Sequence, residues 1–270
     1  MSVWIDGRLV ADHEAVVPYD DHGITVGDGA FETIRWRGGE LFALDRHLDR
    51  LERSLAALLL DGPSRAEVEA ACAAVAAEHG GDGFVRITVT GGQGPLGSPR
   101  EDARSRLIVA MRPGEVRTDP TDVVVVPWTR NERGALAGVK STSYADNVIA
   151  LAYAQARGAD EALFANTRDE LCEGTGSNVF VVIDDRLVTP PLDSGCLAGI
   201  NRALLLEVLD DVEEAPLPMS QLDRATEMFL TSTGRLVQPV RALDGVALAS
   251  CVGPHTQRAI DAWTKAYGRN

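Results

Sequence analysis

The sequence contains very little lysine. Only Lys140 and Lys265 occur in 270 residues, although Lys and Arg together number 26. Lys265 lies in a polar C-terminal segment, whereas Lys140 follows the small, apolar run GALAGV. An ε-amine in a dry pocket becomes nucleophilic when it is neutral, and arginine cannot replace it because a guanidinium stays protonated. Codon bias toward arginine also explains rare lysine, so position alone leaves Lys140 as either a tolerated residue or a catalytic amine.

Basic charge is scarce overall. Against 40 acidic residues the chain has 26 basic ones, which gives a net charge of -14. This balance argues against a nucleic-acid partner, which needs a basic surface to replace phosphate counterions. No apolar run approaches the roughly 20 residues that span a bilayer, and the stretch MSVWIDGRLVADHE lacks the basic region and apolar core of a signal peptide. We therefore expect a cytoplasmic protein with no membrane partner.

Metal-binding and disulfide patterns are also missing. The cysteines lie far apart, none forms a CxxC pair, and the five histidines are equally scattered. Structural zinc sites use closely spaced Cys and His ligands, so we expect no metal. The burial preference of cysteine predicts reduced core residues instead. These are Cys72, Cys172, Cys196 and Cys251.

The first half of the chain has the pattern of a small α+β domain. Short apolar runs around Asp6-Gly7 and around residues 37–40 predict two β-hairpins. Asp45 is a candidate N-cap for a helix with one apolar face, and Ser64 begins a second helix through a capping-box pattern. Further strands of the sheet are expected at FVRITVT (84–90) and RLIVAM (106–111).

The second half has the pattern of a mixed α/β domain. DVVVVP, EALFA and VFVVI predict strands, and YADNVIALAYAQARG and INRALLLEVLDD predict helices. The polar stretch RPGEVRTDPTD, with two prolines and no periodicity, is the expected connection between the halves. We therefore predict a small N-terminal α+β domain at 1–113, a linker at 114–121 and a large C-terminal α/β domain at 122–270.

A glycine-rich stretch, LCEGTGSNVFVV, offers a partner for amine chemistry. Glu173 precedes two glycines and an asparagine, directly ahead of an apolar strand. Alone, a glutamate in a glycine turn is usually a solvated loop residue. Beside a Schiff-base lysine it has a specific role, because a pyridoxal ring withdraws electrons only when its nitrogen is protonated, and a carboxylate holds that proton.

Two further stretches have features of a phosphate cradle. In SGCLAGINRALLLEVL, Gly199 precedes a helix whose first backbone N–H groups, at Ile200 and Asn201, would point outward. In FLTSTGRLVQPV, three consecutive hydroxyl side chains precede a glycine; these residues are Thr231, Ser232, Thr233 and Gly234. Each feature is weak alone, and the order of lysine, glutamate, glycine helix start and hydroxyl turn is what points to pyridoxal phosphate.

Six motifs in order resemble the class IV pyridoxal-phosphate enzymes: DHGITVGDGAFETIRW, RHLDRLERS, Lys140, CEGTGSNVF, LAGINRALL and FLTSTGRLVQPV. That family includes branched-chain aminotransferases, D-amino-acid aminotransferases and aminodeoxychorismate lyases. The resemblance covers roughly residues 3–250. It implies the fold type IV arrangement, an α/β protein of two domains with pyridoxal 5'-phosphate between them. It also implies an obligate homodimer with its site near the interface.

The resemblance implies roles for single residues. Lys140 matches the catalytic lysine that forms the internal aldimine and moves the α-proton. Arg50 matches the phosphate-binding arginine, Glu173 the partner of the ring nitrogen, and Tyr144 a tyrosine that hydrogen-bonds the ring hydroxyl. The other cofactor-binding residues implied are Leu197 against the ring, and Gly199, Ile200, Asn201, Ser232 and Thr233 around the phosphate. The family usually has Thr in place of Asn201, so only the backbone role of this residue carries over.

For the residues that face the substrate, the sequence leaves alternatives open. Alternation in FETIR puts Phe31, Thr33 and Arg35 on one strand face, at positions that match substrate-facing ones in the family. Arg86 and Arg35 are alternative partners for a substrate carboxylate, and surface salt bridges are an equally good explanation of both before the family match. Gly234 is a further substrate-facing candidate.

One loop, TGGQGPLGSPRED, departs from the family pattern. Several D-amino-acid aminotransferases and the lyases have a carboxylate-binding arginine there, and the nearest counterpart in this chain is Leu96. Arg100 would substitute only if the loop folds differently. The missing arginine weakens the lyase, whose substrate is a dicarboxylate, and also a standard D-alanine enzyme. The start GDGAFETIR nevertheless resembles the D-amino-acid and lyase branches more than the branched-chain branch.

We therefore predict an aminotransferase that moves an amino group between a D-amino acid and a 2-keto acid and also accepts primary amines. The alternative is a 4-amino-4-deoxychorismate lyase that releases pyruvate and p-aminobenzoate, and a branched-chain aminotransferase is a further alternative within the family. A catalytically inactive binding protein of the same fold is a hypothesis of another class. The intact set of Lys140, Glu173 and Arg50 argues against it.

Overall fold

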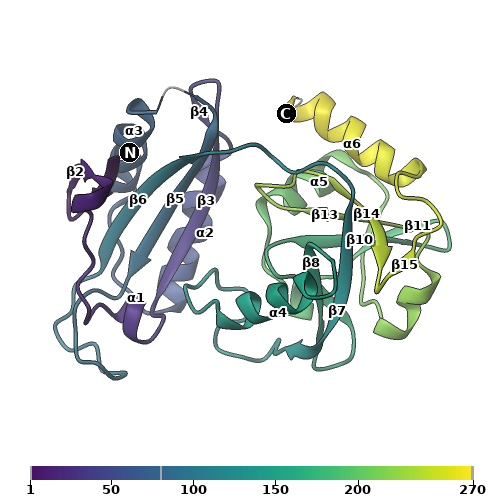
Figure 1. Cartoon of the computed structure of the whole chain (residues 1–270), viewed down its shortest axis with the longest axis horizontal. Helices are drawn as coiled ribbons and strands as arrows, with labels where there is room; N and C mark the ends of the chain where they lie inside the picture. The colour runs from purple at the N-terminus through teal and green to yellow at the C-terminus, as the bar shows by residue number, and fades with distance from the viewer. Residues whose placement is uncertain (1, 80, 269–270) are drawn as a thin grey trace. The chain divides into compact units, whose positions relative to one another are not determined.

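Figure 1 shows the computed structural model of the chain, in which residues 2–79 and 81–268 are described. The chain divides into two compact units. Unit 1 comprises Met1–Glu115 and Val139–Tyr144, and unit 2 comprises Val116–Gly138 and Ala145–Asn270. The division at Glu115 lies inside the expected linker. The return of Val139–Tyr144 to unit 1 differs from the prediction, which placed all of 122–270 in the second domain.

Backbone hydrogen bonds explain why this segment belongs to unit 1. Phe31 N donates to Lys140 O at 3.0 Å, and Thr142 N donates to Gly29 O at 2.8 Å. Ala30 and Ser141 form an isolated antiparallel bridge at the same place. The lysine segment is thus an extra, very short partner of the strand that begins at Gly29. Periodicity in a local sequence window contains no signal for such a long-range pairing.

Unit 1 is a six-stranded antiparallel sheet with the order β2-β1-β6-β5-β3-β4. Its strands are β1 (Ser2–Ile5), β2 (Arg8–Ala11), β3 (Gly29–Arg37), β4 (Glu40–Leu41), β5 (Gly83–Thr90) and β6 (Arg106–Pro113). Its helices are the short α1 (His22–Thr25), α2 (Leu44–Ala57) and α3 (Arg65–Ala77), with a 3-10 turn η1 (Asp12–Glu14).

Both predicted hairpins are confirmed. Asp6 and Gly7 have φ values of 51° and 77°, the left-handed conformation that a tight two-residue turn between twisted strands requires. Gly38 and Gly39 have the same conformation between β3 and β4. Two adjacent residues with positive φ favour glycine and short polar side chains, which is why the sequence marks these turns so clearly.

The predicted helices form, but one predicted cap is wrong. Ser64 caps α3, where its hydroxyl accepts a hydrogen bond from Glu67 N at 3.2 Å. Helix α2 begins one residue before Asp45, and its N-cap is Ala43 in a left-handed conformation with no side-chain hydrogen bond. The connection from β4 to α2 has only two residues, so the chain turns at Ala43, and Asp45 lies in the first helical turn.

Alternation along β3 and β5 separates a core face from an open face. Ile34, Val85 and Ile87 are fully buried and pack with residues of α2 and α3 in one apolar cluster. Side chains of the neighbouring positions, including Phe31, Thr33 and Arg86, therefore point to the opposite face of the sheet. The candidate substrate residues of unit 1 lie on this second face.

Unit 2 is built on a nine-stranded mixed sheet with the order β12-β11-β10-β13-β14-β7-β8-β9, and β15 pairs with β14. The pairs β11–β12, β14–β7 and β7–β8 are parallel. Its strands are β7 (Thr121–Arg130), β8 (Glu161–Asn166), β9 (Leu171–Gly174), β10 (Asn178–Ile183), β11 (Arg186–Thr189), β12 (Val212–Glu214), β13 (Glu227–Thr231), β14 (Gln238–Leu243) and β15 (Val246–Ala247). Its helices are α4 (Ala145–Gln155), α5 (Ile200–Val208) and α6 (Pro254–Tyr267), with 3-10 turns η2 (Leu192–Ser194) and η3 (Met219–Arg224).

The predicted strands of unit 2 form where apolar runs are continuous. Every residue of β8, β10 and β13 is buried, as expected for strands covered on both faces. Phe180 and Phe229 stack at 4.7 Å between ring centroids on adjacent strands. The predicted helices correspond to α4 and α5. Strands β9, β11 and β12 and helix α6 were not expected, because short or polar segments have little periodicity.

Within residues 2–79 and 81–268, no helix is long and apolar enough to cross a membrane. The same residues contain no group of three or more His, Cys, Asp and Glu side chains arranged to hold a metal ion. All four cysteines carry free thiols. Both units combine helices with a sheet, so the predicted α/β class is confirmed.

Candidate active site

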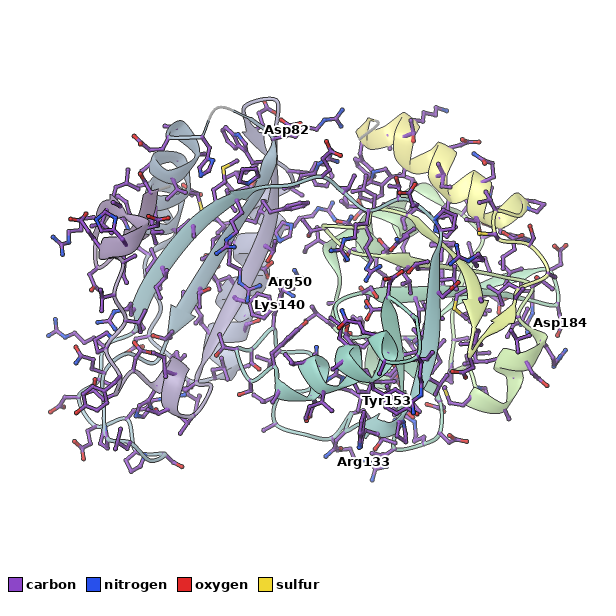
Figure 2. All side chains as sticks on the ribbon, in the orientation of Figure 1. Arg50, Asp82, Arg133, Lys140, Tyr153 and Asp184 are labelled. Atoms are coloured by element: carbon purple, nitrogen blue, oxygen red, sulfur yellow. The ribbon has the colours of Figure 1, made fainter. Side chains whose placement is uncertain are left out.

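Lys140, labelled in Figure 2, lies beside the aromatic ring of Phe31 in unit 1. Its Nζ is 4.2 Å from the centroid of the Phe31 ring, and Cζ of Arg86 is 3.4 Å from the same centroid. Tyr144 contacts this ring edge-on, with centroids 5.3 Å apart. The face of an aromatic ring attracts cations, which helps to hold an amine and a guanidinium in one place. The structure thus brings together four of the predicted site residues.

Arg86 and Arg35, on the same face of the sheet, have N–H donors that are not paired with a described carboxylate. Arg86 Nη1 donates to Thr33 Oγ1 at 3.3 Å, and these residues face each other across β3 and β5. Arg35 lies two residues further along β3, where partial burial and the nearby Arg37 lower its pKa. Among the described carboxylates, none forms a salt bridge with Arg86 or Arg35. A guanidinium has five N–H donors, so both side chains can bind an incoming carboxylate.

Arg50 belongs to a buried network on the core face of β3. Its Nε donates to Glu32 Oε1 at 2.7 Å and its Nη2 donates to Oε2 at 2.8 Å, the bidentate geometry that suits a carboxylate. His47 Nδ1 lies 2.7 Å from Glu32 Oε2. Burial raises the pKa of Glu32, but the hydrogen bonds from Arg50 and His47 outweigh this effect and lower it to about 2. Burial also lowers the pKa of His47.

Sequence reasoning missed Glu32 and His47. Glu32 lies between Phe31 and Thr33 in β3, so its side chain points to the opposite face of the sheet. That face packs against helices, where a charged residue is unusual. His47 and Arg50 are three residues apart on α2 and therefore share one helical face. The sequence did contain a signal for this network: a glutamate at a core-facing strand position, followed by a His-x-x-Arg pair on the next long helix. Arg50, labelled in Figure 2, was predicted from the resemblance alone, and its hydrogen bonds to Glu32 place it in this network.

Arg100 in the glycine loop after β5 is hydrogen-bonded to the residue before β3 and to the end of α2. Arg100 donates to both carboxylate oxygens of Asp28 at 2.7 and 2.6 Å, and also to the backbone carbonyls of Leu58 and Leu59. Leu96, the expected counterpart of a carboxylate-binding arginine, is 65% exposed. Arg100 is thus committed to Asp28 and does not substitute for the missing arginine in this loop conformation.

In unit 2, Glu173 lies on strand β9 and not in a turn, which corrects the prediction from sequence. It pairs with Phe164 of β8, and the glycine turn begins after Gly174. Leu197 N donates to Glu173 Oε2 at 2.8 Å, and Arg130 Nε lies 3.3 Å from Oε1. Leu197, predicted to pack on the cofactor ring, therefore also orients the carboxylate through its backbone. Arg130 was not predicted.

A second buried glutamate, Glu161, holds the turn that follows Glu173. Thr175 N donates to its Oε1 at 3.0 Å, Ser177 Oγ donates to Oε2 at 2.9 Å, and Arg235 Nη2 donates to Oε2 at 3.2 Å. A Cβ at Gly174 would overlap Ser177 Oγ, so the tight turn requires glycine. Sequence reasoning missed Glu161 because it follows an ordinary loop and begins an apolar strand.

The predicted phosphate residues of unit 2 lie together at the start of α5. Gly199 is the N-cap, with no side-chain cap and no acidic residue in the first helical turn, so the N–H groups of Ile200 and Asn201 favour an anion. A Cβ at Gly199 would overlap Asn178 Oδ1. Asn201 Nδ2 donates to Ser232 O at 2.9 Å and so joins the helix start to the hydroxyl turn.

The hydroxyl turn itself is well defined. Ser232 O also accepts hydrogen bonds from the backbone N–H groups of Arg235 and Leu236, and Gly234 O accepts one from Arg117 N at 2.7 Å. Thr233 is partly exposed in this turn, while Thr231 Oγ1 is buried without a hydrogen-bond partner. Unit 2 thus presents a fixed carboxylate, an uncapped helix start and a hydroxyl, which fit the ring nitrogen and the phosphate of a phosphorylated pyridine aldehyde. Unit 1, taken by itself, presents an amine that fits its aldehyde and a buried arginine.

Comparisons with known proteins agree with this chemistry. Residues 29–243 match the family described as amino-transferase class IV. A putative branched-chain-amino-acid aminotransferase of Methanocaldococcus jannaschii is 32% identical, covering 91% of this chain and 88% of that protein. A D-alanine aminotransferase of Bacillus licheniformis is 31% identical, covering 95% of this chain and 94% of the other.

Solved structures of the same kind superpose closely. A fold IV-transaminase from Curtobacterium pusillum has a TM-score of 0.86 at 29% identity, covering 100% of this chain and 99% of that one. A branched-chain amino acid aminotransferase complexed with N-(5'-phosphopyridoxyl)-L-glutamate has a TM-score of 0.91 at 26% identity, covering 99% of this chain and 94% of that one. A putative 4-amino-4-deoxychorismate lyase from Legionella pneumophila has a TM-score of 0.85 at 26% identity, covering 94% and 96%.

Proposed function

Because the chain belongs to the class IV aminotransferases, we propose that it transfers an amino group between an amino acid and a 2-keto acid through Lys140. Class IV aminotransferases use pyridoxal 5'-phosphate, and the expected fold type IV architecture is confirmed by the superpositions. One observation carries the proposal: Lys140 Nζ and the Arg86 guanidinium both contact the ring of Phe31. An amine for covalent chemistry and a cation for a carboxylate thus share one aromatic side chain.

Pyridoxal phosphate supplies an aldehyde for amines and a ring that withdraws electrons from the α-carbon. Lys140 would hold this group through Nζ, and the same nitrogen would take the α-proton of the substrate and return it. Glu173 would accept the hydrogen bond of the ring nitrogen, and Leu197 N–H keeps its carboxylate oriented. Tyr144 would donate to the ring hydroxyl. The phosphate would be bound by Arg50, by the N–H groups of Ile200 and Asn201 beside Gly199, and by Ser232 and Thr233.

The α-carboxylate of the substrate is assigned to Arg86. Its described acceptor is the hydroxyl of Thr33 and its ring contact is Phe31, so a bidentate pair with a carboxylate remains open to it. Arg35, two residues along β3, is the second candidate, and Gly234 would leave space for the substrate from unit 2. If Arg86 binds the carboxylate, Arg86→Ala should weaken turnover of amino acids far more than turnover of simple amines. Equal losses would reject the assignment, and Arg35→Ala is the parallel variant.

For the donor we propose D-amino acids, with primary amines also accepted. The start GDGAFETIR and the D-alanine aminotransferases among the relatives support this choice. The branched-chain relative from Methanocaldococcus jannaschii supports L-branched-chain amino acids as the alternative donor. The lyase neighbour supports a second reaction, release of pyruvate from aminodeoxychorismate. The commitment of Arg100 to Asp28 and the exposed Leu96 leave the glycine loop after β5 without a cation for a carboxylate, so the lyase reaction would have to use both Arg86 and Arg35 for its dicarboxylate.

The two lysines provide a matched test of the covalent role. Purified protein should show the visible absorption band of lysine-bound pyridoxal phosphate, and borohydride should fix the cofactor on the peptide that contains Lys140. Lys140→Ala should remove the band and the activity, whereas Lys265→Ala, on α6, should retain both. Protein that stays colourless with added cofactor would contradict the proposal.

Three incubations separate the reactions. D-alanine with 2-oxoglutarate should give pyruvate only when the keto acid is present. L-leucine with 2-oxoglutarate tests the branched-chain alternative, and aminodeoxychorismate tests the lyase through p-aminobenzoate. Formation of p-aminobenzoate with no amino transfer from either amino acid would replace the aminotransferase with the lyase.

We also propose a homodimer in the cytoplasm. Several large apolar side chains of each unit are exposed, among them Tyr19 and Leu59 in unit 1 and Val148 and Ile149 on α4. Exposed apolar groups on this scale support burial against a second copy. The four free thiols support a reducing compartment. Light scattering coupled to size exclusion tests the dimer, and a monomeric mass at micromolar concentration would reject it.

A further inference from the structure

Arg130 is a charged residue of unit 2 that no role in the proposed reaction yet explains. It is the last residue of β7, and the adjacent strand β8 separates it from β9, which carries Glu173. Its guanidinium crosses β8 above the Phe164 ring, with Cζ 4.3 Å from the ring centroid. Phe164 is the residue that pairs with Glu173 in the sheet. The arginine therefore reaches over one strand to the carboxylate of the next.

Two contacts hold the guanidinium in this position. Its Nη1 donates to Asn147 Oδ1 at 2.9 Å, and the amide nitrogen of Asn147 donates to Thr175 O in the turn after Glu173. The Phe164 ring covers its face. An arginine side chain fixed by a ring and a buried amide loses little further freedom when it pairs with a carboxylate. In this position Nε lies 3.3 Å from Glu173 Oε1, so the two side chains form an ion pair without a hydrogen bond from Nε.

The two carboxylate oxygens of Glu173 receive different partners. Oε2 accepts the Leu197 N–H at 2.8 Å, and Oε1 lies against the positive charge of Arg130. The side chains of Glu173 and Arg130 are 13% and 20% exposed, so water screens this pair only weakly. A nearby opposite charge favours the ionised form of a carboxylate. An ionised Glu173 is the form that accepts a hydrogen bond from a protonated ring nitrogen.

We propose that Arg130 is a positioning residue for Glu173: it orients the carboxylate and keeps it ionised, so that a pyridine nitrogen held against Glu173 remains protonated. This inference rests on the proposed function, because it requires pyridoxal phosphate at Glu173. The guanidinium stabilises the pair of a charged carboxylate and a charged ring nitrogen over the neutral pair. Without it, the proton moves from the ring nitrogen toward the carboxylate, and the ring withdraws electrons less strongly.

The test compares Arg130→Met with Arg133→Met, which removes the same charge three residues away. Arg133 is 78% exposed, and its ion-pair partner is Glu132, not Glu173. Each purified protein is loaded with pyridoxal phosphate labelled with ¹⁵N in the ring, and the ¹⁵N chemical shift reports whether that nitrogen is protonated. A merely structural role for Arg130 would not move this shift.

We expect a protonated ring nitrogen in the wild type and in Arg133→Met, and a shift toward the unprotonated value in Arg130→Met. An opposite charge at this range changes a protonation equilibrium by about tenfold or more. We therefore expect kcat to fall by about tenfold or more, with the KM of the amino donor nearly unchanged. An unchanged ¹⁵N shift in Arg130→Met overturns the inference.

A second neutral variant covers the case in which Arg130→Met does not fold. Arg130→Gln removes the positive charge but keeps a polar side chain, so it should also move the ¹⁵N shift toward the unprotonated value, and a wild-type shift would overturn the inference. If the wild type takes up no cofactor, the proposed function fails and the inference fails with it. If the wild type is loaded and active while the ¹⁵N shift in the Arg130 variants matches wild type, only the inference fails.

Discussion

Replacement of Glu32 by glutamine tests the buried network that holds Arg50. Glu32 is fully buried, and its carboxylate accepts two hydrogen bonds from Arg50 and contacts His47. Its pKa falls from 4.5 to about 2 in the folded protein. At about 1.4 kcal/mol for each pKa unit, ionised Glu32 contributes about 3 kcal/mol to the free energy of unfolding. Glutamine also leaves the buried guanidinium of Arg50 without a charge partner, so we expect a loss of about 3–5 kcal/mol.

The same pKa values predict how stability depends on pH. The folded pKa of Glu32 is lowered, so its contribution is complete above the unfolded value of about 4.5 and is lost as the pH falls toward 2. The pKa of His47 is also lowered, from 6.5, so protons bind preferentially to the unfolded chain as the pH falls below that value. Both groups therefore destabilise the wild type on acidification, and Glu32→Gln should lack the steeper loss below pH 4.5.

Urea unfolding of the cofactor-free protein, followed by circular dichroism at several pH values from 7 to 3, measures both effects. The matched control is Glu52→Gln, an exposed glutamate of α2 near Arg65, for which we expect a change within about 0.5 kcal/mol. The reasoning is refuted if Glu32→Gln is as stable as Glu52→Gln at pH 7. It is equally refuted if acidification from pH 5 to 3 lowers the stability of Glu32→Gln as much as that of the wild type.

Two further substitutions test unit 2. Phe229→Ala removes the partner stacked on Phe180 in a fully buried core, and should lower the free energy of unfolding by about 3–5 kcal/mol in urea titrations; a loss below about 1 kcal/mol would contradict the packing. Gly199→Ala places a Cβ on Asn178 Oδ1 at the start of α5, so we expect weaker binding of pyridoxal phosphate in fluorescence titrations. Gly176→Ala, where a Cβ meets only open space, is the control, and equal affinity of the two variants would count against the proposed phosphate site.

Features that depend on neighbouring residues in the chain were predictable. The hairpin at Asp6-Gly7 and the cap at Ser64 follow from the local conformations that these residues prefer. Continuous apolar runs identified β8 and β10 because strands covered on both faces need apolar side chains at every position. The cap at Asp45 failed because the tight connection after β4, and not the capping preference of aspartate, decides where α2 begins.

For the candidate site, sequence supplied the reactive groups and tertiary structure supplied their partners. Lys140 stood out because arginine cannot do the chemistry of a neutral amine, and this holds wherever the residue lies in the fold. Its place in unit 1, beside Phe31, follows from backbone pairing with β3 across more than a hundred residues of chain. No local pattern encodes such a pairing.

The buried charges show the same division. Glu32, Glu161 and Arg130 look ordinary in the sequence, since each is a single charged residue in or next to an apolar strand. Only the fold brings Arg50 to Glu32, Arg235 to Glu161, and Arg130 over Phe164 to Glu173. The sequence by itself determined which residues are able to react. The tertiary structure decided which charges hold them, because a buried charge is stable only where distant segments bring its partner within a few ångströms.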